Sequence, residues 1–427
     1  MNTSSMASQV NGSNIIFEEG FANFSSLVNS SDIVFEEGFT NFSSPVNRSN
    51  IVFEEGIANF SNSLYSKLDR TGNEFLSPYS ITSALLLLML GTGKTTNKQM
   101  KSVIFEYEEP DDIDLGYQLL NEKLFTRTTS GVTLAMANRL YSRKGLNLLN
   151  TFSTKASTYY GSDVEPLDFV KEAENSRLTI NNWISNNTNN RIQNMIPKGV
   201  LNANTVLVLT NAIYFKGKWE KEFNTKDTAQ RNFFVRANEQ KLVNMMYGKF
   251  DAKSGEDLSL DCKVLQLPYQ GNQISMIFVL PNSGDGLSEL ESKLTVNTFK
   301  TLLSSLKTQK TIIRIPKFTM TSEYDLKPVC TALGITEIFD DKIADFSEMF
   351  KSDDTRVRVT EARHKAFIEV NEEGSEAAAA TSLTISLTSA RIPDPQLFEF
   401  VADHPFLFVI QDDETGAPLF IGRYARP

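Results

Sequence analysis

The chain has 427 residues, of which 41% are hydrophobic and 22% are charged, and its formal net charge is −10 at pH 7. This hydrophobic content is enough for a large buried core, so it excludes a chain that is disordered throughout. The negative charge argues against a general nucleic-acid or heparin binder, because such proteins displace counterions with a basic face.

The N-terminal region contains one nine-residue motif three times. Its copies begin at Phe17, Phe35 and Phe53, so they are 18 residues apart, which is about five helical turns. Only the third copy continues into apolar residues at helical spacing, and it predicts a first helix near 51–68. We expect residues 1–48 to be a flexible extension carrying two extra helix starts, one of which can alternatively dock in place of the third, and residues 49–427 to form one domain.

The first ten residues contain no apolar segment, so they do not resemble a secretory signal. The longest apolar run, over 84–90, is too short to cross a bilayer. We therefore expect a cytoplasmic protein without membrane association. Eight N-x-S/T sequons leave open an extracellular location reached by another route. Cys262 and Cys330 are expected to be separate buried thiols.

Beyond residue 68 the pattern mixes helices and strands, which predicts an α+β domain with long antiparallel strands. Gly271-Asn272 lies between two strand patterns and predicts a hairpin turn. The predicted helices cover 81–89 and 178–184, and the predicted strands cover 206–215, 263–267, 274–280, 311–318, 366–370 and 406–410.

The sequence offers little catalytic chemistry. It has only two histidines, His364 and His404, and neither CxxC nor HExxH occurs, which argues against a metal site. A GxSxG nucleophile elbow is also missing. We therefore expect no enzyme, no metal and no cofactor, and we interpret both histidines as structural.

The segment over 374–389 has an unusual pattern. Read with a period of two, one face carries small and then apolar side chains, while the other carries small and then polar ones, as in a strand with one buried side. Its alanine run would equally suit a helix. Gly374 is a candidate hinge before it, and Pro393 and Pro395 follow it, so the segment is a strand candidate that continues into an exposed loop.

Several motifs resemble blocks of the serpin family, in family order from about residue 49 to the end. The segment KAFIEVNEEGSEAAAAT over 365–381 resembles the serpin hinge signature, and DHPFLFVI over 403–410 with LFIGR over 419–423 resembles the serpin C-terminus. The other similar blocks are FLSPYSI at 75–81, NAIYFKGKW at 211–219, LPYQG at 267–271 and ADFS at 344–347. The chain looks most similar to the intracellular, ovalbumin-like branch.

The resemblance implies a serpin fold with three β-sheets, about nine helices and an exposed reactive-centre loop. It implies a suicide-substrate inhibitor of serine proteases, with cysteine proteases as a further target class: the loop is cleaved, an acyl-enzyme is trapped and the loop inserts into the central sheet. The alternative is a non-inhibitory serpin with a chaperone, carrier or storage role. By matching positions, the hinge comprises Glu372, Gly374, Ser375, Ala377, Ala378, Ala379, Ala380 and Thr381, and the shutter and breach comprise Ser77, Ser80, Asn211, His364 and Trp219.

The family's hinge-to-bond length, counted from Glu372, places the reactive bond at Thr388-Ser389, which would favour an elastase-like target. Arg391-Ile392 is the alternative bond and would direct the loop to trypsin-like enzymes, and Leu387 would suit a chymotrypsin-like one. The expected partner is the protease in a covalent complex with a monomer. Heparin is not expected, because the segment over 106–114 is acidic.

Overall fold

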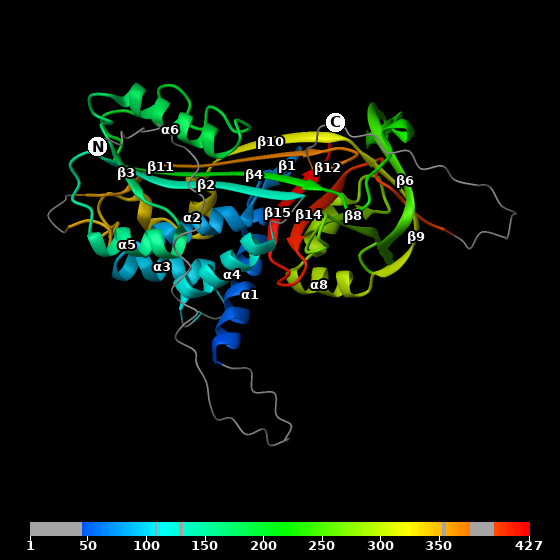
Figure 1. Ribbon diagram of the computed structural model, residues 1–427, viewed down its shortest axis with the longest axis horizontal. Helices are drawn as coiled ribbons and strands as arrows, with labels where there is room; N and C mark the ends of the chain where they lie inside the picture. The colour runs from blue at the N-terminus through cyan, green and yellow to red at the C-terminus, as the bar shows by residue number, and fades with distance from the viewer. Residues whose placement is uncertain (1–44, 107–109, 111, 128–130, 352–355, 376–396) are drawn as a thin grey trace, which may run out of the picture. The chain divides into compact units, whose positions relative to one another are not determined.

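The computed structural model describes residues 45–106, 110, 112–127, 131–351, 356–375 and 397–427 (Figure 1). Within these residues the chain forms nine α-helices and two short 3-10 helices. The helices are α1 (Pro45–Ser66), α2 (Pro78–Leu90), α3 (Lys94–Ile104), α4 (Ile113–Arg127), α5 (Asn150–Tyr160), α6 (Ala173–Asn187), η1 (Thr225–Asp227), α7 (Leu287–Lys293), α8 (Val296–Ser304), α9 (Leu326–Leu333) and η2 (Glu337–Phe339). None of these helices is long and apolar enough to cross a membrane.

A six-stranded sheet holds the segment that the sequence singled out. Its strands lie in the order β10-β11-β4-β2-β3, and the short β12 pairs with β4. The longest three strands run the length of the sheet in Figure 1, with α6 on one face and α2 on the other. The strands are β2 (Val132–Arg143), β3 (Val164–Leu167), β4 (Leu207–Lys218), β10 (Phe318–Asp325), β11 (Val359–Val370) and β12 (Gly374–Ser375).

A nine-stranded sheet contains the other strands, in the order β1-β15-β14-β8-β7-β6-β9-β13, with β5 also paired to β6. The resemblance implied three sheets, but strand pairing unites two of them because β6 pairs with β5 in its first half and with β7 in its second. The strands are β1 (Glu74–Leu76), β5 (Ala229–Arg236), β6 (Glu239–Asp257), β7 (Cys262–Pro268), β8 (Ile274–Pro281), β9 (Lys307–Pro316), β13 (Phe398–Val401), β14 (Phe406–Asp412) and β15 (Pro418–Tyr424).

The first helix begins earlier than the sequence predicted, at Pro45, because proline is tolerated in a first helical turn, where its missing N–H has no partner to lose. Phe53, Ile57 and Phe60 are buried as their spacing predicted. Gly56 lies against a neighbouring helix so closely that a Cβ there would be 2.5 Å from the ring of Phe105. Most of the extension expected over 1–48 lies outside the described residues.

Most other predicted elements are found, with longer bounds. Gly271 and Asn272 join β7 to β8 with φ angles of 92° and 53°, which confirms the predicted hairpin turn. One prediction is wrong: the strand over 311–318 is divided, since β9 ends at Pro316 and β10 begins at Phe318 in the other sheet. Pro316 has no N–H with which to continue the first ladder.

Candidate functional site

The six-stranded sheet contains a parallel pair at its centre. Residues 359–367 of β11 lie parallel to residues 207–214 of β4, whereas the neighbouring pairs β10·β11 and β2·β4 are antiparallel. Two parallel neighbours need a long connection. Unlike an antiparallel pair, they can accept one further strand with the same orientation relative to both. A further strand placed between them would be antiparallel to both. The pair β4·β11 is therefore a geometrically suitable acceptor for one more strand.

The chain already enters this position at one end. After β11, the N–H of Asn371 donates to the carbonyl of Gly374 at 2.7 Å, so the chain reverses. The two residues of β12 then pair antiparallel with β4, Gly374 opposite Lys218 and Ser375 opposite Gly217. A side chain at Gly374 is excluded, because its φ is +147° and a Cβ would lie 1.9 Å from the carbonyl oxygen of Gly217.

Two hinge residues that the sequence singled out are held by buried polar contacts. Ser375 is fully buried, and its hydroxyl lies 2.8 Å from the hydroxyl of Tyr269. The Glu372 carboxylate pairs with Nζ of Lys317 at 2.7 Å and accepts from Oγ1 of Thr228 at 2.7 Å. Burial alone would raise the pKa of Glu372, but these two partners outweigh it and hold the pKa below its ordinary value.

Trp219 lies beside the turn between β11 and β12. Its indole Nε1–H donates to the carbonyl of Asn371 at 2.9 Å, and its backbone N–H donates to the carbonyl of Glu373 at 2.8 Å. Its ring stacks on Tyr269 with the centroids 4.6 Å apart. The predicted breach residue therefore contacts the start of the loop directly. Tyr269, Lys317 and Thr228 were missed, because nothing in their local sequence indicates these distant partners.

The four predicted shutter residues lie together where the start of α2 packs against the parallel pair. The amide of Asn211 donates to the carbonyl of Ser80 at 2.8 Å and to its hydroxyl at 2.6 Å. Ser77 donates its backbone N–H to Nε2 of His364 at 3.3 Å, so the Nδ1–H of that ring is free to donate to Oδ1 of Asn211. Because His364 and Asn211 are also register partners, this cluster joins β11 to β4 where an added strand would have to separate them.

The shutter cluster continues into the neighbouring strand β2, so that its polar residues form a row across the sheet. Asn138 of β2 is the register partner of Asn211 and accepts a hydrogen bond from its amide. Asn138 was not among the site residues predicted from the sequence. The only sign of its role is that it lies opposite Asn211 in the β2·β4 ladder. That position is known from the strand register and not from the sequence. The role of the row as a shutter stays a prediction.

His364 is fully buried and neutral. Burial lowers the pKa of its imidazole from the ordinary value to about 3. Between this value and about 6.5, the unfolded chain binds a proton that the folded protein does not. The contribution of His364 to stability is therefore fully present above about pH 6.5 and is lost as the pH falls toward 3.

We expect the free energy of unfolding to fall by about 2 kcal/mol from this group alone between pH 7 and pH 5. Denaturant unfolding at both pH values, for the parent and for His364→Gln, measures it. We expect the variant to be less stable overall and its free energy of unfolding to depend less on pH. An equal pH dependence in the two proteins would contradict the buried, neutral imidazole.

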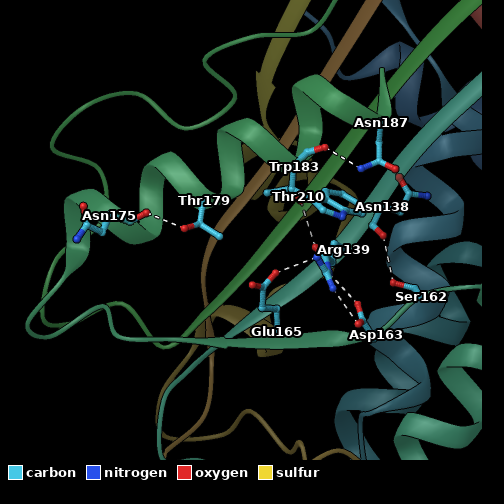
Figure 2. A network of polar contacts seen from close by, with 10 residues as sticks. All are labelled: Asn138, Arg139, Ser162, Asp163, Glu165, Asn175, Thr179, Trp183, Asn187 and Thr210. Atoms are coloured by element: carbon cyan, nitrogen blue, oxygen red, sulfur yellow. Dashed lines mark hydrogen bonds and ion pairs between the residues drawn. The ribbon is translucent and has the colours of Figure 1, made fainter. Parts of the chain in front are cut away.

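Helix α6 covers the other face of the same strands, where Ile180 and Ile184 are fully buried. Figure 2 shows the guanidinium group of Arg139, on β2, between Trp183 of α6 and two carboxylates. Its carbon lies 4.8 Å from the Trp183 ring centroid, and its nitrogens lie 2.7 Å from Asp163 and 2.8 Å from Glu165. This contact helps to hold α6 against the sheet. With α6 on one face and α2 on the other, the β4·β11 pair is covered on both faces.

No group of three or more His, Cys, Asp or Glu side chains is placed to hold a metal ion in the described part of the chain. Cys262 and Cys330 are free, buried thiols, as expected, and burial raises the pKa of each to about 12. Nε2 of His404 lies 2.7 Å from the carbonyl oxygen of Pro281, a contact that fits the structural role expected for this histidine. The remaining predicted site residues lie outside the described residues: Ala377, Ala378, Ala379, Ala380, Thr381, Leu387, Thr388, Ser389, Arg391 and Ile392.

Comparisons with known proteins match nearly the whole described chain. A family model described as serpin (serine protease inhibitor) matches residues 55–427. Leukocyte elastase inhibitor A of Rattus norvegicus is 39% identical over 368 residues, covering 85% of this chain and 95% of that protein. Serpin B3 of Homo sapiens is 38% identical over 378 residues, covering 84% and 94%. The solved structure of uncleaved ovalbumin has a TM-score of 0.78 at 29% identity, covering 88% of this chain and 100% of that one.

Proposed function

Because the chain belongs to the serpin family of serine protease inhibitors, we propose that it inhibits its target as a suicide substrate, by inserting its cleaved loop between β4 and β11. The family and the α+β serpin fold are those expected from the sequence. The match to ovalbumin also agrees with the expected branch. The observation that carries the proposed mechanism is β12, which already occupies the first two positions of a strand antiparallel to β4.

The register of β12 indicates how the rest of the loop would insert. Continuing the pairing of Ser375 with Gly217 places Thr381 opposite Asn211 and Ile385 opposite Leu207. Residues directly opposite in a ladder have side chains on the same face. The odd-numbered residues of β4 from 207 to 215, apart from Asn211, belong to the large core cluster, while Val208 and Ala212 face the cluster beneath α6. The apolar face of the loop segment would therefore meet the large core.

The alternation noted in the sequence fits this register. Ala377 and Ala379 would pass opposite Phe215 and Ile213, where the acceptor is densely packed, and Leu383 would follow opposite Leu209. Small side chains enter first and larger apolar ones fill the far end. Each backbone hydrogen bond gained contributes about 0.5–1.5 kcal/mol net, so insertion of the whole segment would release on the order of ten kcal/mol. A protease attached at the loop end would be carried along.

The proposed target class follows from the reactive bond and from the relatives. Thr388 has a small side chain that suits a shallow specificity pocket, and the name of the relative from Rattus norvegicus describes an inhibitor of leukocyte elastase. We therefore favour an elastase-like protease, with a trypsin-like protease acting at Arg391 as the second candidate. The cytoplasmic location and the monomeric state stay predictions from the sequence.

The test is incubation of the full chain with pancreatic elastase and, separately, with trypsin. We expect a complex of protein and protease that survives boiling in SDS, because the acyl bond is covalent. Mass spectrometry of the released C-terminal peptide identifies the bond, and a peptide beginning at Ser389 supports elastase-like specificity. Complete cleavage without any complex, with both enzymes, would favour the non-inhibitory alternative.

A further inference from the structure

The first helix of the fold is encoded three times in the chain. One copy of the repeated motif, which begins at Phe53, forms the middle of α1. The other two begin at Phe17 and Phe35, before the first described residue, and we call them the upstream copies. The proposed function gives them no role. The contacts that α1 makes through its own copy define what an upstream copy needs in order to bind in the same place.

The buried face of α1 can be built from any of the three copies. The helix packs against α2, α3 and α4, and Phe53 is fully buried with its ring centroid 5.7 Å from that of Phe105. Ile57, Phe60 and Leu64 are also buried on this face. The upstream copies have an apolar residue at each of these four positions. They are Phe17, Phe21, Phe24 and Val28 in the first copy and Phe35, Phe39, Phe42 and Val46 in the second.

The fourth position of the motif needs a glycine, because the packing there is too close for a side chain. A Cβ on Gly56 would lie 2.5 Å from the ring of Phe105, so a larger residue would have to displace that ring. Glycine otherwise weakens the interior of a helix. Gly20 and Gly38 stand at this position in the upstream copies, so both copies can approach Phe105 as closely as α1 does.

The upstream copies also keep the charged contacts of α1. The carboxylate of Glu54 lies 3.2 Å from Nζ of Lys123 on α4. The carboxylate of Glu55 lies 3.6 Å from Nζ of Lys300 on α8. Each pair is partly exposed and contributes little energy, but together the two pairs favour one orientation of the helix on its neighbours. The corresponding residues are Glu18 and Glu19 in the first copy and Glu36 and Glu37 in the second.

The third copy keeps two advantages over the others. Only this copy is followed by Tyr65, whose hydroxyl donates to Glu291 at 2.7 Å. It also has the shortest connection to β1, over 67–73, whereas the second copy would need 49–73 and the first 31–73. A longer connection costs more entropy to close, which disfavours the second copy about sevenfold and the first about fifteenfold. The second copy is therefore the better substitute of the two.

We propose that the site of α1 is a docking site shared by the three copies, and that the second copy, residues 35–46, occupies it when the third copy is displaced or damaged. The occupant belongs to the same chain, because its tether holds it near the site at a higher effective concentration than a second molecule reaches in dilute solution. The exchange keeps α2 covered, and the start of α2 holds Ser77 and Ser80 of the shutter cluster. The serpin fold would therefore survive the loss of its own first helix.

The test is urea unfolding of Phe53→Ala, Phe60→Ala and the double variant in the full chain. Removing one buried phenylalanine ring raises the unfolding equilibrium constant by more than about a hundredfold, and two such losses about two helical turns apart nearly add in free energy. With a substitute available, the loss has an upper limit, because the second copy replaces both altered residues together. We expect the equilibrium constant of the double variant to exceed that of either single variant by no more than about tenfold.

The matched background carries Phe17→Asp and Phe35→Asp, which place a charge where a buried ring would dock. These two changes alone should leave the stability unchanged. In this background the double variant should exceed the single variants by at least about a hundredfold, or should not fold. Leu85→Ala is the control, because Leu85 is buried on α2 and no copy supplies a substitute for it. Its effect should be equal in both backgrounds.

Three results would overturn the proposal. One is a full-chain double variant that does not fold, and another is a double variant whose loss of stability is the same in both backgrounds. The third is a double variant that light scattering shows to be folded only as a dimer, because the substitute helix would then come from a second molecule.

Discussion

Ser375→Arg should convert the protein from an inhibitor into a substrate. The Ser375 side chain is fully buried beside Gly217 and Tyr269, in the second pair of the β12 ladder. An arginine there would have to lose its hydration, which costs several kcal/mol when no partner is present. Loop insertion would therefore be slower than hydrolysis of the acyl-enzyme, and the protease would be released. We expect the stoichiometry of inhibition to rise more than tenfold, measured by titration of residual protease activity and by loss of the SDS-stable complex.

Two variants control for this prediction. Ser375→Thr keeps the hydroxyl that meets Tyr269 and should remain an inhibitor. Glu376→Arg changes the next residue, whose register partner would be Lys216 on the other side of the sheet, and should also inhibit. Ser375→Arg protein that still inhibits at a stoichiometry near that of the parent would show that the hinge does not enter the sheet.

Cleavage within the loop should make the protein markedly more resistant to heat. In the intact protein, β4 and β11 pair directly and in parallel along most of their length. After cleavage, the loop segment can run between them and be antiparallel to both, which replaces one parallel ladder by two antiparallel ones. A gain on the order of ten kcal/mol predicts a rise in melting temperature of at least about 10 °C for a domain of this size.

Differential scanning calorimetry before and after limited proteolysis measures this rise. Cleaved Ser375→Arg protein is the control, because its loop should stay out of the sheet and its melting temperature should resemble that of the intact form. Equal melting temperatures for intact and cleaved parent protein would mean that no insertion energy is stored, and the proposed mechanism would be wrong.

The sequence predicted local elements well and long-range partners poorly. The Gly271-Asn272 turn could be predicted because the signal and the structure involve the same residues. The period of two over 374–389 stays a prediction beyond Ser375, because the rest of that segment lies outside the described residues. The ion pair of Glu372 with Lys317 could not be predicted, because it joins residues from different elements. No local pattern in the sequence reports which lysine comes near a buried carboxylate.

The hydrogen-bonded polar residues at the β4·β11 pair illustrate the same limit. Ser77, Ser80, Asn211 and His364 were grouped through a family resemblance, and the structure brings them together. Asn138 completes the row but needed the β2·β4 register to be found. The start of α1 was also placed late, since Pro45 resembles a loop residue until its first-turn position is known.

The two residues of β12 have a consequence for the lifetime of the protein. On the proposed mechanism, the loop segment must first reverse direction and find its register on β4. Because β12 is already paired with β4, this slow first step of insertion is complete before any protease binds. The remaining insertion would be delayed by a kinetic barrier made by the hydrogen bonds of Asn211 and by the packing of α6 on the sheet. On this mechanism the active form would be a metastable intermediate, whose lifetime is set by a rate rather than by an equilibrium. Its inhibitory potency would then decay with time and warmth even in a pure, protease-free solution.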